Sequence, residues 1–239
     1  DLMWRIQGPL VGDIAALFDF RWKRLESHAA HPDPDQATGA EPDSMGGWGR
    51  LAYTSGLSHR GLVVDLVHRL DAARRRVWLV TPYFFPVASV AESIRGAARR
   101  GVDVQLFLPG RKTDHASIRE AGRGAYDGLL ELGVAIFELD SQMLHAKATM
   151  VDEWVRVGSC NFDAWGANRN LEANIEAYDA SCLRQCVALF EEYRRSFHRV
   201  TRQEWEARPL TQRVTQSALR FTGRTLRSLL VREPLRQSQ

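Results

Sequence analysis

The sequence predicts an α/β protein in which helices flank a mixed β-sheet, with a basic helical tail at the C-terminal end. Between residues 60 and 180, segments with apolar residues at helical spacing alternate with short runs rich in Val, Ile and Leu. Such alternation builds a sheet with helices packed on its faces. Residues at about 211–231 combine leucines and arginines at helical spacing, which is typical of an amphipathic helix.

The composition is that of a soluble globular protein, and its charge is unevenly distributed. Of the 239 residues, 44% are hydrophobic and 26% are charged. A chain of this length can bury one large core or two smaller ones. Residues 208–239 contain seven Arg against one Glu and carry a net charge of +6, whereas the whole chain carries +3. The remainder is therefore weakly acidic, and the basic character belongs to the tail.

Cysteine content argues against a disulfide-rich protein, and hydropathy argues against a membrane-spanning segment. Cys160, Cys182 and Cys186 form a sparse, odd-numbered set, which argues against a disulfide framework and for a reducing compartment. Cys182 and Cys186 stand four apart on an expected helix, where packed thiols are favoured over a metal site. The longest apolar run, residues 77–87, is too short to cross a bilayer and is interrupted by two prolines.

The first 59 residues predict one helix followed by a long loop. A short strand to Ile6, a turn at Gly8-Pro9 and a helix from about Leu10 fit residues 1–25. Residues 26–59 are rich in Pro, Gly, Ser, Asp and Glu, and they predict a linker or long loop with a possible short strand at 51–54. The apolar face of the helix consists of Val11, Ile14, Leu17, Phe18 and Trp22.

From residue 60 onward, helices and strands alternate. The expected helices span about 60–73, 87–100, 115–132 and 181–198, and the expected strands span 77–81, 102–108, 134–139, two within 148–157, and 172–178. Active sites in such sheets lie in loops at strand ends. We therefore expect Tyr83 and the loop L-P-G-R-K-T-D at 108–114 to line a cleft, although Tyr83 could equally be a core residue.

The segment from His145 to Glu176 carries the residues suited to chemistry. His145 and Lys147 are two apart, so in an extended chain both side chains point to the same face. The pattern of residues 148–157 suits two short strands that turn near Asp152. A tight turn of small and polar residues, Gly158-Ser159-Cys160-Asn161, follows and can bring a hydroxyl, an amide and backbone N–H groups to an anion.

These residue types indicate phosphoryl transfer without a metal ion or other cofactor. Lys147 and Asn161 would bind phosphate oxygens, and Ser159 could add a hydroxyl donor. His145 would act as a nucleophile or as the acid and base that serves one, and Glu172 could hold its imidazole in one tautomer. A single H-x-K or G-S-x-N arises often by chance, whereas the combined pattern with N-x-E nine residues further on is far more demanding.

The combined pattern resembles the signature of the phospholipase D superfamily. More closely, it is similar to the second motif of bacterial cardiolipin synthases and related phosphatidyltransferases. The resemblance covers residues 60–200 well and the two ends of the chain more loosely. It rests on T-P-Y-F-F-P at 81–86, L-P-G-R-K-T-D at 108–114, the H-x-K-x4-D pattern from His145, G-S-C-N-F-D from Gly158, and N-L-E-A-N-I-E at 170–176.

The resemblance implies a reaction that needs two histidines. One attacks a phosphodiester to give a phosphohistidine, and the other protonates the leaving alcohol and deprotonates the incoming one. By the resemblance His145 would be the acid and base, Lys147 and Asn161 would hold the phosphate, with Ser159 and Tyr83 beside it, and Asp152 would support the strands of the motif more than it touches substrate. Only one H-x-K stands in this chain, which is the main departure from the family pattern.

We therefore expect residues 1–25 to be the end of a preceding lobe, 26–59 a linker, 60–200 a catalytic lobe and 201–239 a basic helical tail. The missing motif would lie upstream in a longer polypeptide or in a second copy of the chain. The implied function is transfer of a phosphatidyl group between phosphatidylglycerol molecules. The alternatives are a phospholipase D-type phosphodiesterase or nuclease, which hydrolyses a phosphodiester, and a non-catalytic scaffold.

The expected partners are anionic phospholipid and a membrane surface. The predicted helix at about 211–231 places leucines on one side and Arg220, Arg224 and Arg227 on another, which suits attachment to anionic lipid, although a docked terminal helix would show the same pattern. The resemblance implies a peripheral protein at the cytoplasmic face of a bacterial cell membrane. Nucleic acid is not expected as a partner, because no basic groove with interleaved aromatic residues is apparent.

Overall fold

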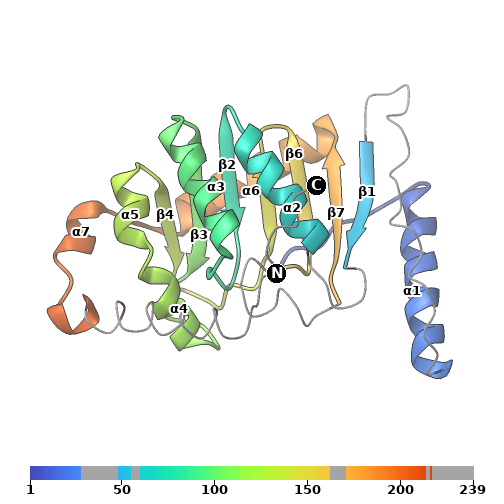
Figure 1. Ribbon diagram of the computed structural model, residues 1–239, viewed down its shortest axis with the longest axis horizontal. Helices are drawn as coiled ribbons and strands as arrows, with labels where there is room; N and C mark the ends of the chain where they lie inside the picture. The colour runs from blue at the N-terminus through green and yellow to red at the C-terminus, as the bar shows by residue number, and fades with distance from the viewer. Residues whose placement is uncertain (28–47, 55–59, 162–170, 214–215, 217–239) are drawn as a thin grey trace, which may run out of the picture.

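The structure is a computed structural model that describes residues 1–27, 48–54, 60–161, 171–213 and 216. Its centre is an eight-stranded mixed sheet with the order β1-β7-β6-β5-β2-β3-β4-β8 (Figure 1). The β2-β3 and β3-β4 pairs are parallel, and the other pairs are antiparallel. The strands are β1 (Trp48–Tyr53), β2 (Arg76–Val80), β3 (Asp103–Pro109), β4 (Ala135–Leu139), β5 (Ala148–Val151), β6 (Trp154–Gly158), β7 (Ala173–Tyr178) and β8 (His198–Val200).

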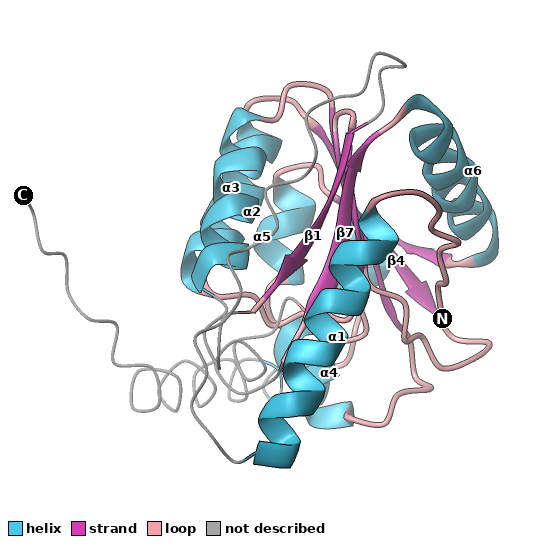
Figure 2. Cartoon of the chain, turned by 90° about the vertical axis from the view of Figure 1, so that its right-hand side faces the viewer, coloured by secondary structure: helices cyan, strands magenta, loops and turns pink. Residues whose placement is uncertain are grey.

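Helices cover both faces of the sheet, as the alternation of segments predicted. Figure 2 shows α2, α3 and α5 on one face and α6 on the other, with α1 beside the β1 edge. The mixed sheet with flanking helices confirms the predicted α/β fold class. The helices are α1 (Leu10–Ser27), α2 (Arg60–Ala72), α3 (Ala88–Arg99), α4 (Ala116–Arg123), α5 (Tyr126–Glu131), α6 (Ala180–Ser196) and α7 (Arg202–Glu206).

Two apolar clusters hold the helices to the sheet. One joins α2, α3 and α5 to the sheet through residues such as Leu70, Ile94 and Leu106. The other joins α6 to the opposite face, where the ring of Phe107 stacks on Phe137 at 4.8 Å between ring centroids. Each fully buried large apolar side chain contributes about 1.5–3 kcal/mol. These two layers make the sheet a rigid platform for the loops at its ends.

The structure differs from the sequence-based prediction at several elements. The predicted strand to Ile6 is absent, whereas the possible short strand at 51–54 is present as β1, which begins earlier, at Trp48. The predicted helix at 115–132 is two helices, because the chain turns after α4 at Gly124 and redirects Tyr126 into the core. Strand β8 was not predicted, since three residues are too short to show a period.

The C-terminal tail lies largely outside the described residues. Residues 210–213 are helical, and Gln216 donates a hydrogen bond to Glu120 at 2.9 Å. The rest of the predicted helix at 211–231, with its three arginines, is not described, and neither are residues 28–47 of the predicted linker. Among the described helices, none is long and apolar enough to span a membrane.

The turn between β5 and β6 is fixed by the carboxylate of Asp152. Its backbone adopts a left-handed conformation with φ of 51°, which Asp tolerates better than most residues. Its side chain accepts hydrogen bonds from the backbone N–H groups of Arg74 (3.0 Å), Arg75 (2.8 Å) and Arg76 (3.0 Å). Burial acts to raise the pKa of Asp152, but these hydrogen bonds outweigh it and hold the pKa below its ordinary value.

We predict that Asp152→Asn destabilises the protein at pH 7 by roughly 1–3 kcal/mol, because charge-assisted hydrogen bonds become neutral ones. The pKa of Asp152 is lowered by folding, so its stabilisation is present above the unfolded-state pKa and is lost as pH falls through the folded-state value. The difference between wild type and variant should therefore shrink below about pH 4. Urea unfolding at several pH values measures this.

Glu153→Gln is the matched control, since Glu153 is the next residue and its half-exposed side chain pairs only with Arg75 in the described part of the chain. We expect it to change stability by less than about 1 kcal/mol. An Asp152→Asn variant as stable as the control at pH 7 would contradict the role given to this carboxylate.

Candidate active site

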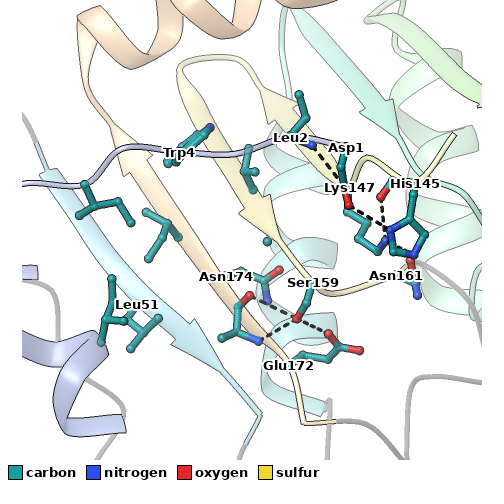
Figure 3. Close-up of a pocket in the computed structure, with 16 residues that line it drawn as sticks. Asp1, Leu2, Trp4, Leu51, His145, Lys147, Ser159, Asn161, Glu172 and Asn174 are labelled. Carbon is teal, nitrogen blue, oxygen red and sulfur yellow. Dashed lines mark hydrogen bonds and ion pairs between the residues drawn. The ribbon is translucent and has the colours of Figure 1, made fainter. Parts of the chain in front are cut away.

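A cavity of about 570 Å³ lies at the sheet end where β5 begins, β6 ends and β7 begins (Figure 3). Because β5, β6 and β7 are antiparallel neighbours, the residues before β5, after β6 and before β7 meet at this one end. The sequence separates these three segments, whereas the sheet brings them together. The polar lining consists of Asp1, His145, Lys147, Ser159, Asn161, Glu172 and Asn174.

His145 and Lys147 are in direct contact. The Lys147 Nζ lies 3.0 Å from the His145 Nε2 and donates to the His145 carbonyl oxygen at 2.8 Å. The His145 Nδ1 lies 3.2 Å from the Asp1 Oδ2. An ammonium group can only donate, so in the neutral imidazole Nε2 accepts and the proton lies on Nδ1. The side chain of His145 is 48% exposed, which leaves it accessible to a ligand, while Lys147 is buried.

The environment favours the neutral form of His145. Burial lowers the pKa of the imidazole, and the adjacent ammonium of Lys147 lowers it further, against the opposing effect of the Asp114 carboxylate. A neutral imidazole at neutral pH can accept a proton from an alcohol or attack a phosphorus atom.

Glu172 is held by Ser159 and not by His145. The Ser159 hydroxyl donates to the Glu172 carboxylate and accepts from the Ala173 N–H at 3.0 Å. The Glu172 N–H in turn donates to the Thr54 hydroxyl at 2.9 Å. In the described structure no hydrogen bond joins Glu172 to His145, so the predicted tautomer-fixing contact is not formed here. Because a serine has one O–H donor, Ser159 cannot donate to Glu172 and to a phosphate at once.

In the described structure, Asn161 brings an unpaired acceptor atom to the cavity. Its Oδ1 is buried, and within the described ranges it has no hydrogen-bond partner. Asn161 lines the cavity together with His145 and Lys147, and Figure 3 shows the three at the same end of it. This Oδ1 is an acceptor and suits a donor such as an alcohol hydroxyl, whereas the predicted binding of a phosphate oxygen would use the Nδ2 group of the same amide.

Two other predicted site residues lie apart from the cavity. Asp152 is in the turn at the far end of β5, where it holds backbone N–H groups. Tyr83 does not line the cavity, and its hydroxyl donates to the Asp114 Oδ2 at 2.7 Å. Asp114 nevertheless acts electrostatically on His145, so the loop at 108–114 borders the site. Arg111 pairs with Asp140, and Lys112 donates to the Ser141 carbonyl.

The N-terminal segment is the part of the cavity that the sequence analysis missed. Leu2, Trp4 and Ile6 line the cavity, and so does Ile14 of α1. The alternation of these apolar residues with polar or exposed neighbours indicates an extended segment but does not identify its packing partner. Within the described ranges, no group of three or more His, Cys, Asp or Glu residues is arranged to hold a metal ion.

Comparison with known proteins gives one family. Residues 66–200 match a family model described as cardiolipin synthase, PLD-like domain. Cardiolipin synthase A of Proteus mirabilis is 30% identical over 226 residues, which cover 92% of this chain and 46% of the relative. Cardiolipin synthase A of Klebsiella pneumoniae is 29% identical over 227 residues, with the same shares covered. The chain thus spans about half the length of the curated relatives it matches.

Solved structures share the fold. The phospholipase D family member Nuc of Salmonella typhimurium gives a TM-score of 0.54 at 18% identity, with 65% of this chain and 99% of that chain covered. The phosphatidylserine synthase of Haemophilus influenzae gives a TM-score of 0.61 at 14% identity, with 94% of this chain and 55% of that chain covered. At these identities the likeness concerns the fold.

We predict opposite pKa changes at His145 for two substitutions. Lys147→Met removes a positive charge beside the imidazole and should raise the pKa of His145. Asp114→Asn removes a negative charge and should lower it. Titration of the His145 ring resonances by NMR measures both changes, and the amide spectra of the variants verify that they are folded.

A pKa of His145 that stays constant in Lys147→Met, or that rises in Asp114→Asn, would contradict the electrostatic account of the site. His68 is exposed on α2 and does not line the cavity, so its ring resonances serve as the internal reference.

Proposed function

The chain belongs to the family of cardiolipin synthase, phospholipase D-like domains, and on this premise we propose that it forms one half of a phosphatidyltransferase. The reaction transfers a phosphatidyl group between phosphatidylglycerol molecules through a phosphohistidine. One observation carries the proposal: an accessible, neutral histidine contacts a buried lysine in a cavity that the Asn161 amide also lines. A general acid or base and two phosphate ligands are what this transfer requires of one lobe.

In the proposed mechanism, a histidine outside this chain attacks the phosphorus of the donor lipid. A P–N bond forms, the P–O bond to the leaving glycerol breaks, and His145 as an imidazolium gives its proton to that oxygen. The now neutral His145 removes a proton from the incoming alcohol, which attacks the phosphohistidine and displaces the first histidine. Lys147 and Asn161 hold the non-bridging phosphate oxygens throughout. With water as acceptor, the same steps amount to hydrolysis.

The half-length match supports a site completed elsewhere. About half of each curated relative lies outside the match to this chain. We propose that this chain is the C-terminal half, with a first-motif lobe supplied upstream in the same polypeptide. A second copy of the chain is the alternative source of the other histidine. The carboxylate of Glu172 stands at the cavity wall beside Ser159, where it can face a group from the completing lobe.

The proposed site of action is the cytoplasmic face of a bacterial membrane. The relatives named above are from bacteria, and by name they synthesise cardiolipin. We propose that the chain is a peripheral protein and that the basic tail, with seven arginines in residues 208–239, attaches it to anionic lipid. Addition of salt should weaken such attachment.

The proposal predicts that His145→Gln lowers lipid turnover by roughly 10²- to 10⁴-fold, the usual contribution of a general acid and base. Cardiolipin and phosphatidic acid are quantified after incubation with phosphatidylglycerol vesicles. The assay compares this chain with a longer polypeptide that is expressed from a gene including the upstream coding sequence. We expect activity in the longer form, with cardiolipin as product.

His68→Gln is the matched control, since His68 lies on α2 and not in the cavity, and it should keep full activity. Phosphatidic acid without cardiolipin would indicate a hydrolase. Unchanged turnover in His145→Gln would contradict the proposal.

A further inference from the structure

The cavity has two chemically different ends. His145, Lys147 and Asn161 lie at one end, and in Figure 3 Trp4 and Leu51 lie on the opposite side. All charged side chains of the lining belong to the polar end or to its border at Asp1. The lining of the other end is aliphatic or aromatic and consists of Trp4, Ile6, Ile14, Leu51, Val157 and Ile175, while Leu2 lies beside Asp1 in Figure 3.

The floor of the apolar end is one row of side chains across three strands. Val157 of β6 faces Ile175 of β7, and Ile175 faces Leu51 of β1 in the sheet register. Residues directly opposite one another on neighbouring strands share a face, so the three form a continuous apolar surface. Leu51 and Val157 are buried, whereas Ile175 is partly exposed to the cavity.

The roof is the N-terminal segment. Leu2, Trp4 and Ile6 are partly buried over the cavity, while the intervening Met3 and Arg5 are exposed. This segment forms no strand; Leu2 and Trp4 pack against the apolar cluster that includes Val157, and Asp1 contacts His145. The apolar end is thus a slot between the sheet and an extended segment of chain, and it opens into the polar end.

An amphiphilic phosphodiester fits a cavity of this kind. We propose that the apolar end binds the glycerol backbone and first acyl carbons of a glycerophospholipid whose phosphate lies at His145 and Lys147. The inference rests on the proposed function and adds a subsite that selects lipid over other phosphodiesters. The volume of about 570 Å³ lies within the range of about 300–1,000 Å³ typical of small-molecule sites.

The apolar lining continues onto the surface of α1. Ile14 lines the cavity, and Val11 and Phe18 lie three before and four after it, on the same helix face. Val11 is 46% exposed, Phe18 is 62% exposed, and Trp22, stacked on Phe18, is 54% exposed. Acyl carbons that extend past the cavity would meet this stripe. A nucleic acid would instead place charged phosphates and sugars along this stripe. Its apolar residues cannot replace the hydration that the phosphates would lose.

Binding measurements on the whole chain test the subsite. The probes are dihexanoylphosphatidylglycerol below its critical micelle concentration, glycerophosphoglycerol, which has the same headgroup without acyl chains, and a dithymidine monophosphate. We expect the lipid to bind at least tenfold more tightly than either other probe, the gain from burying about two methylene groups. Amide NMR shifts should reach residues 2–6, 51 and 175 with the lipid, but only 145–161 with glycerophosphoglycerol.

Substitutions at the apolar end should remove the preference for lipid. Ile175→Thr in the floor and Ile6→Thr in the roof should lower it to about threefold or less, while glycerophosphoglycerol binding stays unchanged. The two residues belong to different elements, so loss of fold in one variant leaves the other as the test. Val64→Thr is the matched control, since Val64 is exposed on α2 away from the cavity, and it should keep the full preference.

The subsite would be overturned if the wild type bound dihexanoylphosphatidylglycerol and glycerophosphoglycerol with equal affinity and the amide NMR shifts were confined to the polar end. The proposed function would remain intact. The apolar end would then be a surface for another part of a longer polypeptide. Binding of the dithymidine probe in preference to both glycerol probes would overturn the subsite and the proposed lipid substrate together.

Discussion

The close approach of β6 and β7 at Gly158 is the constraint on which the site depends. Gly158 faces Asn174 in the register, and a Cβ at this position would overlap the Ala173 carbonyl oxygen and the Asn174 Cα. A side chain here would force the strands apart, since backbone atoms cannot yield as a flexible side chain can. The contact lets the Ser159 N–H donate to the Ala173 carbonyl at 3.1 Å. Ser159 and Glu172 are thereby fixed beside the loop that carries His145.

The electrostatics of the site follow from what each charged group already contacts. Glu172 accepts a hydrogen bond from Ser159 and makes none with His145 in the described structure, whereas Lys147 places its positive charge beside the imidazole. The result is a neutral histidine beside an ammonium group. A bound phosphodiester would add a negative charge near both, which favours the imidazolium. Substrate binding would thus help to protonate the group that must act as an acid.

Much of the site could be predicted from sequence, because it depends on local spacing. His145 and Lys147 lead directly into β5 in an extended chain, so their spacing of two placed them together. The partner of Glu172 could not be predicted, since it depends on the register of β6 and β7, which brings Ser159 beside Glu172. The possible strand at 51–54 is present as β1, but its pairing with β7 could not be predicted, because it joins residues more than one hundred positions apart. The alternation of Leu2, Trp4 and Ile6 indicated an extended segment. The surface against which this segment packs could not be predicted, because the segment pairs with no strand and apolar contacts have no characteristic sequence pattern.

The central claim is that His145 moves protons and that the covalent bond to phosphorus forms on a histidine outside residues 1–239. The most direct test is to locate the phosphoryl group by mass spectrometry after a longer polypeptide containing this chain reacts with a p-nitrophenyl phosphodiester and is quenched in alkali. A p-nitrophenolate leaving group needs no acid, so His145→Ala should still give the covalent intermediate, with the phosphorus on a histidine outside this chain. Phosphorus found on His145 in the wild type would contradict the account and make His145 the nucleophile.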